Sequence, residues 1–132
     1  MPKSTMSTTL NYSPNFDVKK RKVKELKFII FHYTGMKKEN QAITRLTNTK
    51  SKVSSHYLIK NNGEILTLVP DLYIAWHAGV SSWKNYKSIN KYSIGIEISN
   101  PGHEYSYKNF SKKQIKSILK LSTYLRKKYK IK

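Results

Sequence analysis

The segment that most constrains the fold is an apolar, β-branched and aromatic run at residues 27–33, KFIIFHY. It has no polar alternation and is closed by Thr34 and Gly35. A continuous run of this length is typical of a strand buried on both faces, which requires neighbouring strands on both sides and helices above and below. The chain is therefore expected to build a central sheet.

Three further segments supply neighbours for that strand. Residues 56–60 and 64–69 are apolar runs joined across Asn61-Asn62-Gly63. Asn-Gly between two such runs predicts a β-hairpin. Residues 93–99 alternate isoleucine with other residues and predict another strand, closed by Asn100-Pro101-Gly102.

Two helices are predicted beside these strands. A short one carries Ala42, Ile43 and Leu46 at helical spacing, and a longer one begins after Ser111, a suitable N-cap. The apolar stripe expected on the long helix consists of Ile115, Ile118, Leu119, Ser122, Leu125 and Tyr129. Residues 70–92 have no clear period and are expected to be a long loop region. The predicted fold class is α/β, with a mixed central β-sheet flanked by helices.

The length of 132 residues corresponds to about one domain. Residues 1–26 are polar and basic, and we expect them to be an N-terminal tail, or an edge strand around Phe16 to Val18. Residues 27–132 form the predicted domain. The absence of cysteine excludes disulfides and thiolate ligands, so that His, Asp and Glu remain as metal ligands.

The formal net charge of +19 favours attraction to anionic polymers in general. All but three of the 26 basic residues are lysine, whereas specific nucleic-acid readers use arginine forks, so no specific nucleic-acid partner is expected. No stretch reaches 18 apolar residues, and no transmembrane segment is expected. The N-terminus lacks the apolar region of a secretory signal. This favours a cytoplasmic location and leaves a periplasmic or secreted one open.

Two residues are the first candidates for chemistry. His32 stands at the end of the buried strand, where side chains emerge at the mouth of an open sheet, and it is either a metal ligand or a satisfied structural histidine. Glu97 points away from the face of Ile94, Ile96 and Ile98. It is either a solvent-facing carboxylate or a general base aimed into a cleft floored by small neighbours.

The remaining candidates are Trp76, His77 and His56. Trp76 and His77 lie in the loop region and suit the wall of a binding site, or a loop anchored by a buried Trp. His56 begins a strand and is interpreted as structural or supporting rather than as a direct ligand. Spacing alone also permits a zinc site of His32, His56 and His77, although no pair has helical i, i+4 spacing.

In order along the chain, these residues resemble the second family of N-acetylmuramoyl-L-alanine amidases, the zinc enzymes that cut bacterial peptidoglycan. The matching segments span roughly residues 28–102; they are residues 29–34 (IIFHYT), 53–59 (VSSHYLI), 68–70 (LVP), 75–79 (AWHAG) and 93–98 (SIGIEI), with Asn100. The resemblance implies the fold that this family shares with peptidoglycan recognition proteins.

The resemblance also implies roles for the candidate residues. His32 would be the first Zn²⁺ ligand and Glu97 the carboxylate that activates the zinc-bound water. Trp76 and His77 would line the substrate groove, and His56 would be a supporting or packing residue. The family places a second His and a carboxylate or Cys on a segment after the long helix. The chain ends at Lys132, so we expect the remaining ligands beyond residue 132, on a C-terminal part that is missing here.

The function implied is zinc-dependent hydrolysis of the amide bond between N-acetylmuramic acid and L-alanine in peptidoglycan or muropeptides. A complementing C-terminal fragment is one expected partner, and the chain alone is expected to be impaired. The alternatives are a non-catalytic protein that binds peptidoglycan or muropeptides, and a basic nucleic-acid-binding protein, which a steep salt dependence would reveal.

Overall fold

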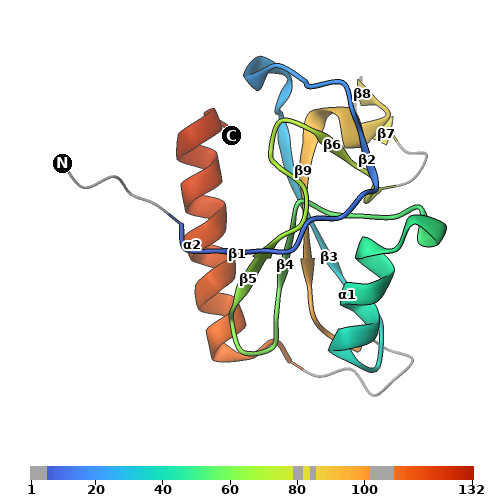
Figure 1. Cartoon of the computed structure of the whole chain (residues 1–132). Helices are drawn as coiled ribbons and strands as arrows, with labels where there is room; N and C mark the ends of the chain where they lie inside the picture. Colours follow the sequence, from blue (N-terminus) through green and yellow to red (C-terminus); the bar gives the residue numbers. More distant parts are fainter. Residues whose placement is uncertain (1–5, 79–81, 84–85, 102–108) are drawn as a thin grey trace.

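The structure is a computed structural model, and it describes residues 6–78, 82–83, 86–101 and 109–132. Its larger elements, shown in Figure 1, are β1 (Thr9–Leu10), β2 (Phe16–Asp17), β3 (Phe28–Tyr33), α1 (Glu39–Thr47), β4 (Tyr57–Ile59), β5 (Ile65–Thr67), β6 (Ile74–Ala75), β7 (Ser82–Trp83), β8 (Tyr86–Lys87), β9 (Ser93–Ile98) and α2 (Lys112–Tyr129). Short 3₁₀ turns cover Val23–Glu25, Thr49–Ser51 and Ile89–Tyr92.

The central sheet has the strand order β1-β5-β4-β9-β3. β9 is parallel to both β3 and β4, whereas β4 and β5 are antiparallel, so the sheet is mixed, as predicted. The predicted hairpin is β4–β5, and its turn contains Gly63 at φ +88°, a left-handed conformation that favours glycine.

The two helices cover opposite faces of the sheet (Figure 1). Leu121 and Leu125 of α2 pack with the β9 isoleucines, Ile94, Ile96 and Ile98. Leu46 of α1 packs with Leu58, Leu66 and Leu68 on the other face. The predicted architecture, a mixed sheet flanked by helices, is therefore confirmed.

The α2 helix begins as predicted, and Ile118, Leu125 and Tyr129 of the predicted stripe pack in or against the core, but the buried face is rotated from the one expected. Ser111 accepts a hydrogen bond from the Gln114 backbone N–H, and the Gln114 side chain accepts one from the Ser111 N–H, which is a capping box. Ile115 and Leu119 are exposed, at 47% and 62%, whereas Gln114 is buried. The buried line includes a glutamine because its Nε2 donates to the Ser99 carbonyl at 2.7 Å, a contact that hydrophobicity cannot reveal.

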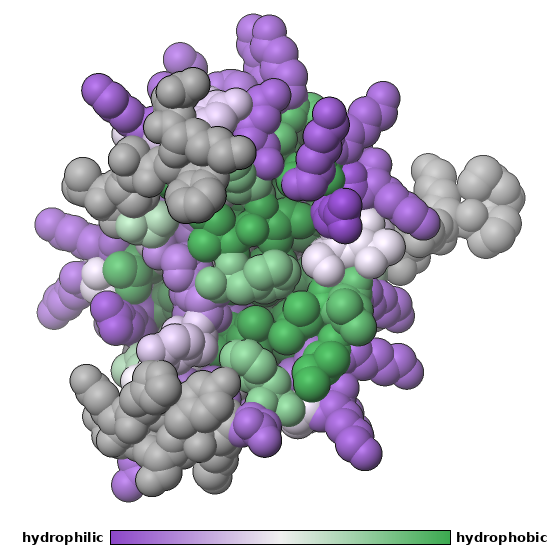
Figure 2. All heavy atoms as spheres, turned by 180° about the vertical axis from the view of Figure 1, so that it is seen from behind, coloured by the Kyte–Doolittle hydropathy of each residue, from purple (hydrophilic) through white to green (hydrophobic). Residues whose placement is uncertain are grey.

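The face opposite to the view of Figure 1 carries an apolar area ringed by hydrophilic side chains (Figure 2). The prediction that residues 27–33 form a strand buried on both faces is wrong, because β3 lies at the edge of the described sheet and pairs only with β9. Its face away from His32 is covered only in part, and Phe31 and Tyr33 are 43% and 49% exposed. None of the described helices combines the length and the apolarity needed to cross a membrane.

The described N-terminal segment packs against the domain from Met6 onward, since Met6 lies against the core and Thr8 accepts a hydrogen bond from Thr67 at 2.7 Å. β1 extends the central sheet beside β5, and β2, at the predicted edge-strand position, pairs with β6 in a separate two-stranded sheet. The Asn15 side chain donates to the carbonyls of Asn48 and Val53, at 2.8 and 2.9 Å. The division of the chain at residue 26 stays a prediction.

Candidate active site

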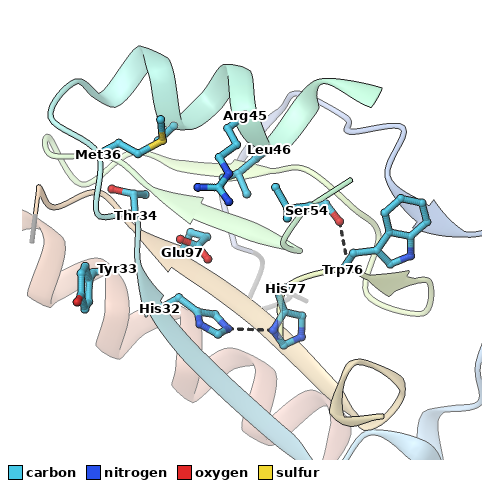
Figure 3. Close-up of a pocket in the computed structure, with 12 residues that line it drawn as sticks. His32, Tyr33, Thr34, Met36, Arg45, Leu46, Ser54, Trp76, His77 and Glu97 are labelled. Atoms are coloured by element: carbon cyan, nitrogen blue, oxygen red, sulfur yellow. Dashed lines mark hydrogen bonds between the residues drawn. The ribbon is translucent and has the colours of Figure 1, made fainter. Parts of the chain in front are cut away.

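His32 and Glu97 are register partners on the parallel strands β3 and β9. Partners in a parallel pair point to the same face, so both side chains leave the sheet on the side that α1 covers. The two residues line one cleft of about 200 Å³, together with Arg45, Ser54, Trp76 and His77 among others (Figure 3).

Glu97 is a carboxyl group in a largely desolvated position. Burial raises its pKa from 4.5 to about 7, and the Arg45 guanidinium acts in the opposite direction. Arg45 extends from α1 toward Glu97 across the cleft (Figure 3). A carboxyl group with a pKa near neutrality can both accept and return a proton, which is what general acid–base catalysis requires.

His77 lies against the backbone of β9. A Cβ atom added to Gly95 would be 2.4 Å from His77 Cγ, so only glycine leaves room for the ring at this position. Gly95 and Glu97 are alternate residues of one strand and face the same side. The small residue predicted beside Glu97 therefore accommodates a histidine ring in the structure.

A chain of hydrogen bonds runs from His32 through His77 to Ser93. His32 Nε2 is 3.0 Å from His77 Nδ1, and His77 Nε2 is 2.9 Å from Ser93 Oγ. The Ser93 hydroxyl donates to the Ile89 carbonyl at 2.8 Å. Burial lowers the pKa of His32 and lowers that of His77 to about 3, so His77 is neutral over the physiological range.

His56 lies behind the cleft and is fully buried. Its Nδ1 accepts from the Gly95 N–H at 3.0 Å, while Nε2 is 2.8 Å from the Tyr73 carbonyl and 3.0 Å from Arg21 Nη2. Burial holds its pKa well below 6.5. Both ring nitrogens of His56 thus contact protein groups, so the residue links three segments of the fold and has no nitrogen directed into the cleft.

The three-histidine zinc site that spacing permitted is not formed. Across the described ranges, no three His, Cys, Asp or Glu side chains are grouped so that they could hold a metal ion. The reason is geometric, because the nitrogens of His56 and His77 point to hydrogen-bond partners rather than to a shared point.

Trp76 forms part of the cleft wall and is tied to two other segments. Its backbone N–H donates to Ser54 Oγ and its indole Nε1–H donates to Asp17 Oδ1, both at 2.9 Å. The neighbouring Gly79 of the AWHAG segment lies outside the described residues.

Sequence reasoning missed Arg45, Ser54 and Ser93. Arg45 carried a weak signal, because arginine is rare in a chain whose cations are nearly all lysine. Ser54 and Ser93 are fully buried serines, and nothing in the sequence distinguishes them from other serines.

The donor set of the cleft fits one metal-ligand position. His32 uses Nε2 toward His77, and no described group hydrogen-bonds to its Nδ1. A metal-binding histidine commonly donates its second ring N–H to a protein acceptor, which His32 can do here. The described residues supply this one position and no complete set of ligands.

The family model described as N-acetylmuramoyl-L-alanine amidase matches residues 21–132. The chain is 34% identical over 119 residues to the N-acetylmuramoyl-L-alanine amidase AmiD of Escherichia coli K12, a match that covers 81% of this chain and 42% of AmiD. It is 51% identical over 47 residues to the 1,6-anhydro-N-acetylmuramyl-L-alanine amidase AmpD of Citrobacter freundii, covering 36% and 25% of the two chains.

The fold is also that of a solved relative. A structure of Escherichia coli AmiD in complex with the substrate anhydro-N-acetylmuramic acid-L-Ala-D-γ-Glu-L-Lys superposes with a TM-score of 0.71 and 33% identity, over 82% of this chain and 46% of that one. The chain therefore belongs to the N-acetylmuramoyl-L-alanine amidase family. It spans less than half the length of these relatives.

Proposed function

We propose that the cleft between β3, β9 and α1 is the active site of a zinc-dependent amidase. Its substrate would be peptidoglycan or a muropeptide, cut at the amide bond between N-acetylmuramic acid and L-alanine. The observation that carries the proposal is the placement of His32 and Glu97 side by side on one face of the sheet, in a cleft walled by Trp76.

In this proposal His32 holds Zn²⁺ through Nδ1, and the other ligands come from residues outside the described set. When bound, zinc supplies a Lewis acid for the carbonyl and acidifies water. Glu97 accepts a proton from the attacking water and returns it to the leaving amine, for which its pKa near 7 is suited. Trp76 offers a ring for contact with a sugar face.

The family membership supports the reaction class, and the solved relative binds a muropeptide. The test is hydrolysis of an anhydro-muropeptide by the zinc-loaded protein, followed by mass spectrometry. Glu97→Gln should reduce the rate at least about 100-fold, as expected for loss of a general base. Glu64→Gln is the matched control, since Glu64 is a hairpin carboxylate paired with Lys60 at 3.1 Å. Equal rates for wild type and Glu97→Gln would refute the role of Glu97.

A second candidate is binding of muropeptides without cleavage. It is favoured by the observation that the described residues contain no group of three metal ligands. Metal analysis separates the two functions: about one zinc per chain supports the amidase, while no zinc together with retained muropeptide binding supports the binding protein.

A further inference from the structure

We infer that Ser93, Gly95 and His77 form a positioning chain that fixes the His32 imidazole as the tautomer protonated at Nε2, with its lone pair on Nδ1. His77 then acts through His32 rather than by giving hydrogen bonds to a substrate. The use of that lone pair for a metal rests on the proposed function, whereas the tautomer itself does not.

The first step is at Ser93, whose hydroxyl has a single hydrogen. Ser93 Oγ and the Ile89 carbonyl oxygen are 2.8 Å apart, and a carbonyl can only accept, so the hydroxyl hydrogen must lie between them. Ser93 Oγ can therefore only accept at its other contact. His77 Nε2, at 2.9 Å, must carry the hydrogen that it donates to Ser93.

The second step is at His77. A neutral imidazole has one N–H, and in His77 that N–H is at Nε2, so Nδ1 is an acceptor. The hydrogen-bond partners of this ring are a serine hydroxyl and a second imidazole, and neither carries a negative charge that would favour a second proton on the ring. Gly95 leaves the space in which the ring lies, because a Cβ atom there would be 2.4 Å from His77 Cγ. Both nitrogens of His77 are used within the protein.

The third step fixes His32. Its Nε2 is 3.0 Å from an acceptor, His77 Nδ1, and must supply the hydrogen between them. Neutral His32 is then deprotonated at Nδ1, which is the form that a metal ion binds and a proton donor can protonate. The tautomer of His32 is thus determined by a series of hydrogen bonds that begins at Ser93, a residue that does not line the cleft.

The test is a ¹H–¹⁵N correlation spectrum of histidine ring nitrogens in chelator-treated, full-length protein at mildly alkaline pH, with His32 assigned by its loss in His32→Gln. We expect a single Nε2–H tautomer for His32 in the wild type. Ser93→Ala removes the acceptor of the His77 N–H, so both rings should become tautomer mixtures. Ser99→Ala is the matched control, since it removes a buried hydroxyl just beyond the same strand.

A wild-type His32 protonated at Nδ1, or present as a mixture, would overturn the inference, and this result does not depend on whether Ser93→Ala folds. An unchanged His32 tautomer in folded Ser93→Ala would overturn it as well. Zinc titration then addresses the proposed function separately. If zinc leaves the ring-nitrogen signals of His32 unchanged, His32 is not a zinc ligand, and the inference about its tautomer is unaffected. If zinc binds, Ser93→Ala should bind it about 10- to 100-fold more weakly.

Discussion

His32 and Glu97 pair across β3 and β9, two parallel strands separated by some sixty residues of sequence, with the backbone of one directly beside the backbone of the other. This pairing gives a histidine and a carboxyl group a shared face without any short motif. Leu58 on β4 pairs with Glu97 from the other side and is fully buried. Glu97 therefore stands between an imidazole and the apolar core under α1, which accounts for its desolvation.

The raised pKa of Glu97 predicts a pH-dependent stability. Its pKa is about 7 when folded and 4.5 when unfolded, so between these values the folded state binds more protons and stability falls as pH rises. The glutamine side chain of Glu97→Gln cannot ionise, so this variant should lack the pH-dependent contribution of Glu97 to the free energy of unfolding. The stability difference, variant minus wild type, should grow from pH 4.5 to about pH 7 and then level off. Urea unfolding of chelator-treated proteins across this range measures it, and a constant difference would contradict the desolvation of Glu97.

Arg45 should set the height of the Glu97 pKa. Its charge lowers that pKa, so Arg45→Gln is predicted to raise it further. The titration of Glu97 can be followed by carboxyl ¹³C NMR shifts. Lys50→Gln is the control, because it removes an equal charge from an exposed position that does not line the cleft. Equal effects of the two variants would mean that Arg45 acts only through net charge.

Gly95 and His77 should be coupled energetically. Gly95→Ala places a methyl group against the His77 ring and should lower the free energy of unfolding by about 1–3 kcal/mol, the usual range for overpacking. In a His77→Ala background the ring is gone, and the same substitution should cost much less. A double-mutant cycle measured by denaturant unfolding gives the coupling. Additive effects would show that the contact is not what restricts position 95.

Much of the fold followed from local sequence rules. The Asn-Gly hairpin and the Ser111 cap depend on neighbouring residues, and the strand at residues 93–98 was visible from its isoleucine alternation. The buried face of α2 was harder, because Gln114 is buried through a hydrogen bond to another segment, whereas apolar Ile115 is exposed.

In the candidate site, too, some residues could be predicted from local sequence, whereas the contacts among others could not. His32 and Glu97 were visible from strand position and pattern, and the cleft contains both. The links among Ser93, Gly95 and His77 depend on how a loop packs on a strand, for which no local rule exists. Their functional roles stay predictions.

Arg21 allows a test of whether the N-terminal segment, residues 1–26, contributes to the stability of the domain. Arg21 is only 4% exposed. Its guanidinium donates to the carbonyls of Asn90 and Lys91, at 2.9 and 3.2 Å, and to that of Asp71 at 2.8 Å. Burial lowers its pKa from 12.5 to about 10, a value that still keeps it charged near neutral pH. A buried cation connects this segment to two loops of the domain.

Arg21→Ala should therefore lower the free energy of unfolding by about 2–4 kcal/mol, because it leaves buried carbonyls without their donor. Lys20→Ala, at an exposed position one residue earlier, should change it by no more than about 0.5 kcal/mol. Denaturant unfolding of the two variants under identical conditions makes the comparison. If residues 1–26 were a tail that contributes nothing to the domain, the two variants would be equally stable. A large difference places the start of the cooperative unit before Arg21.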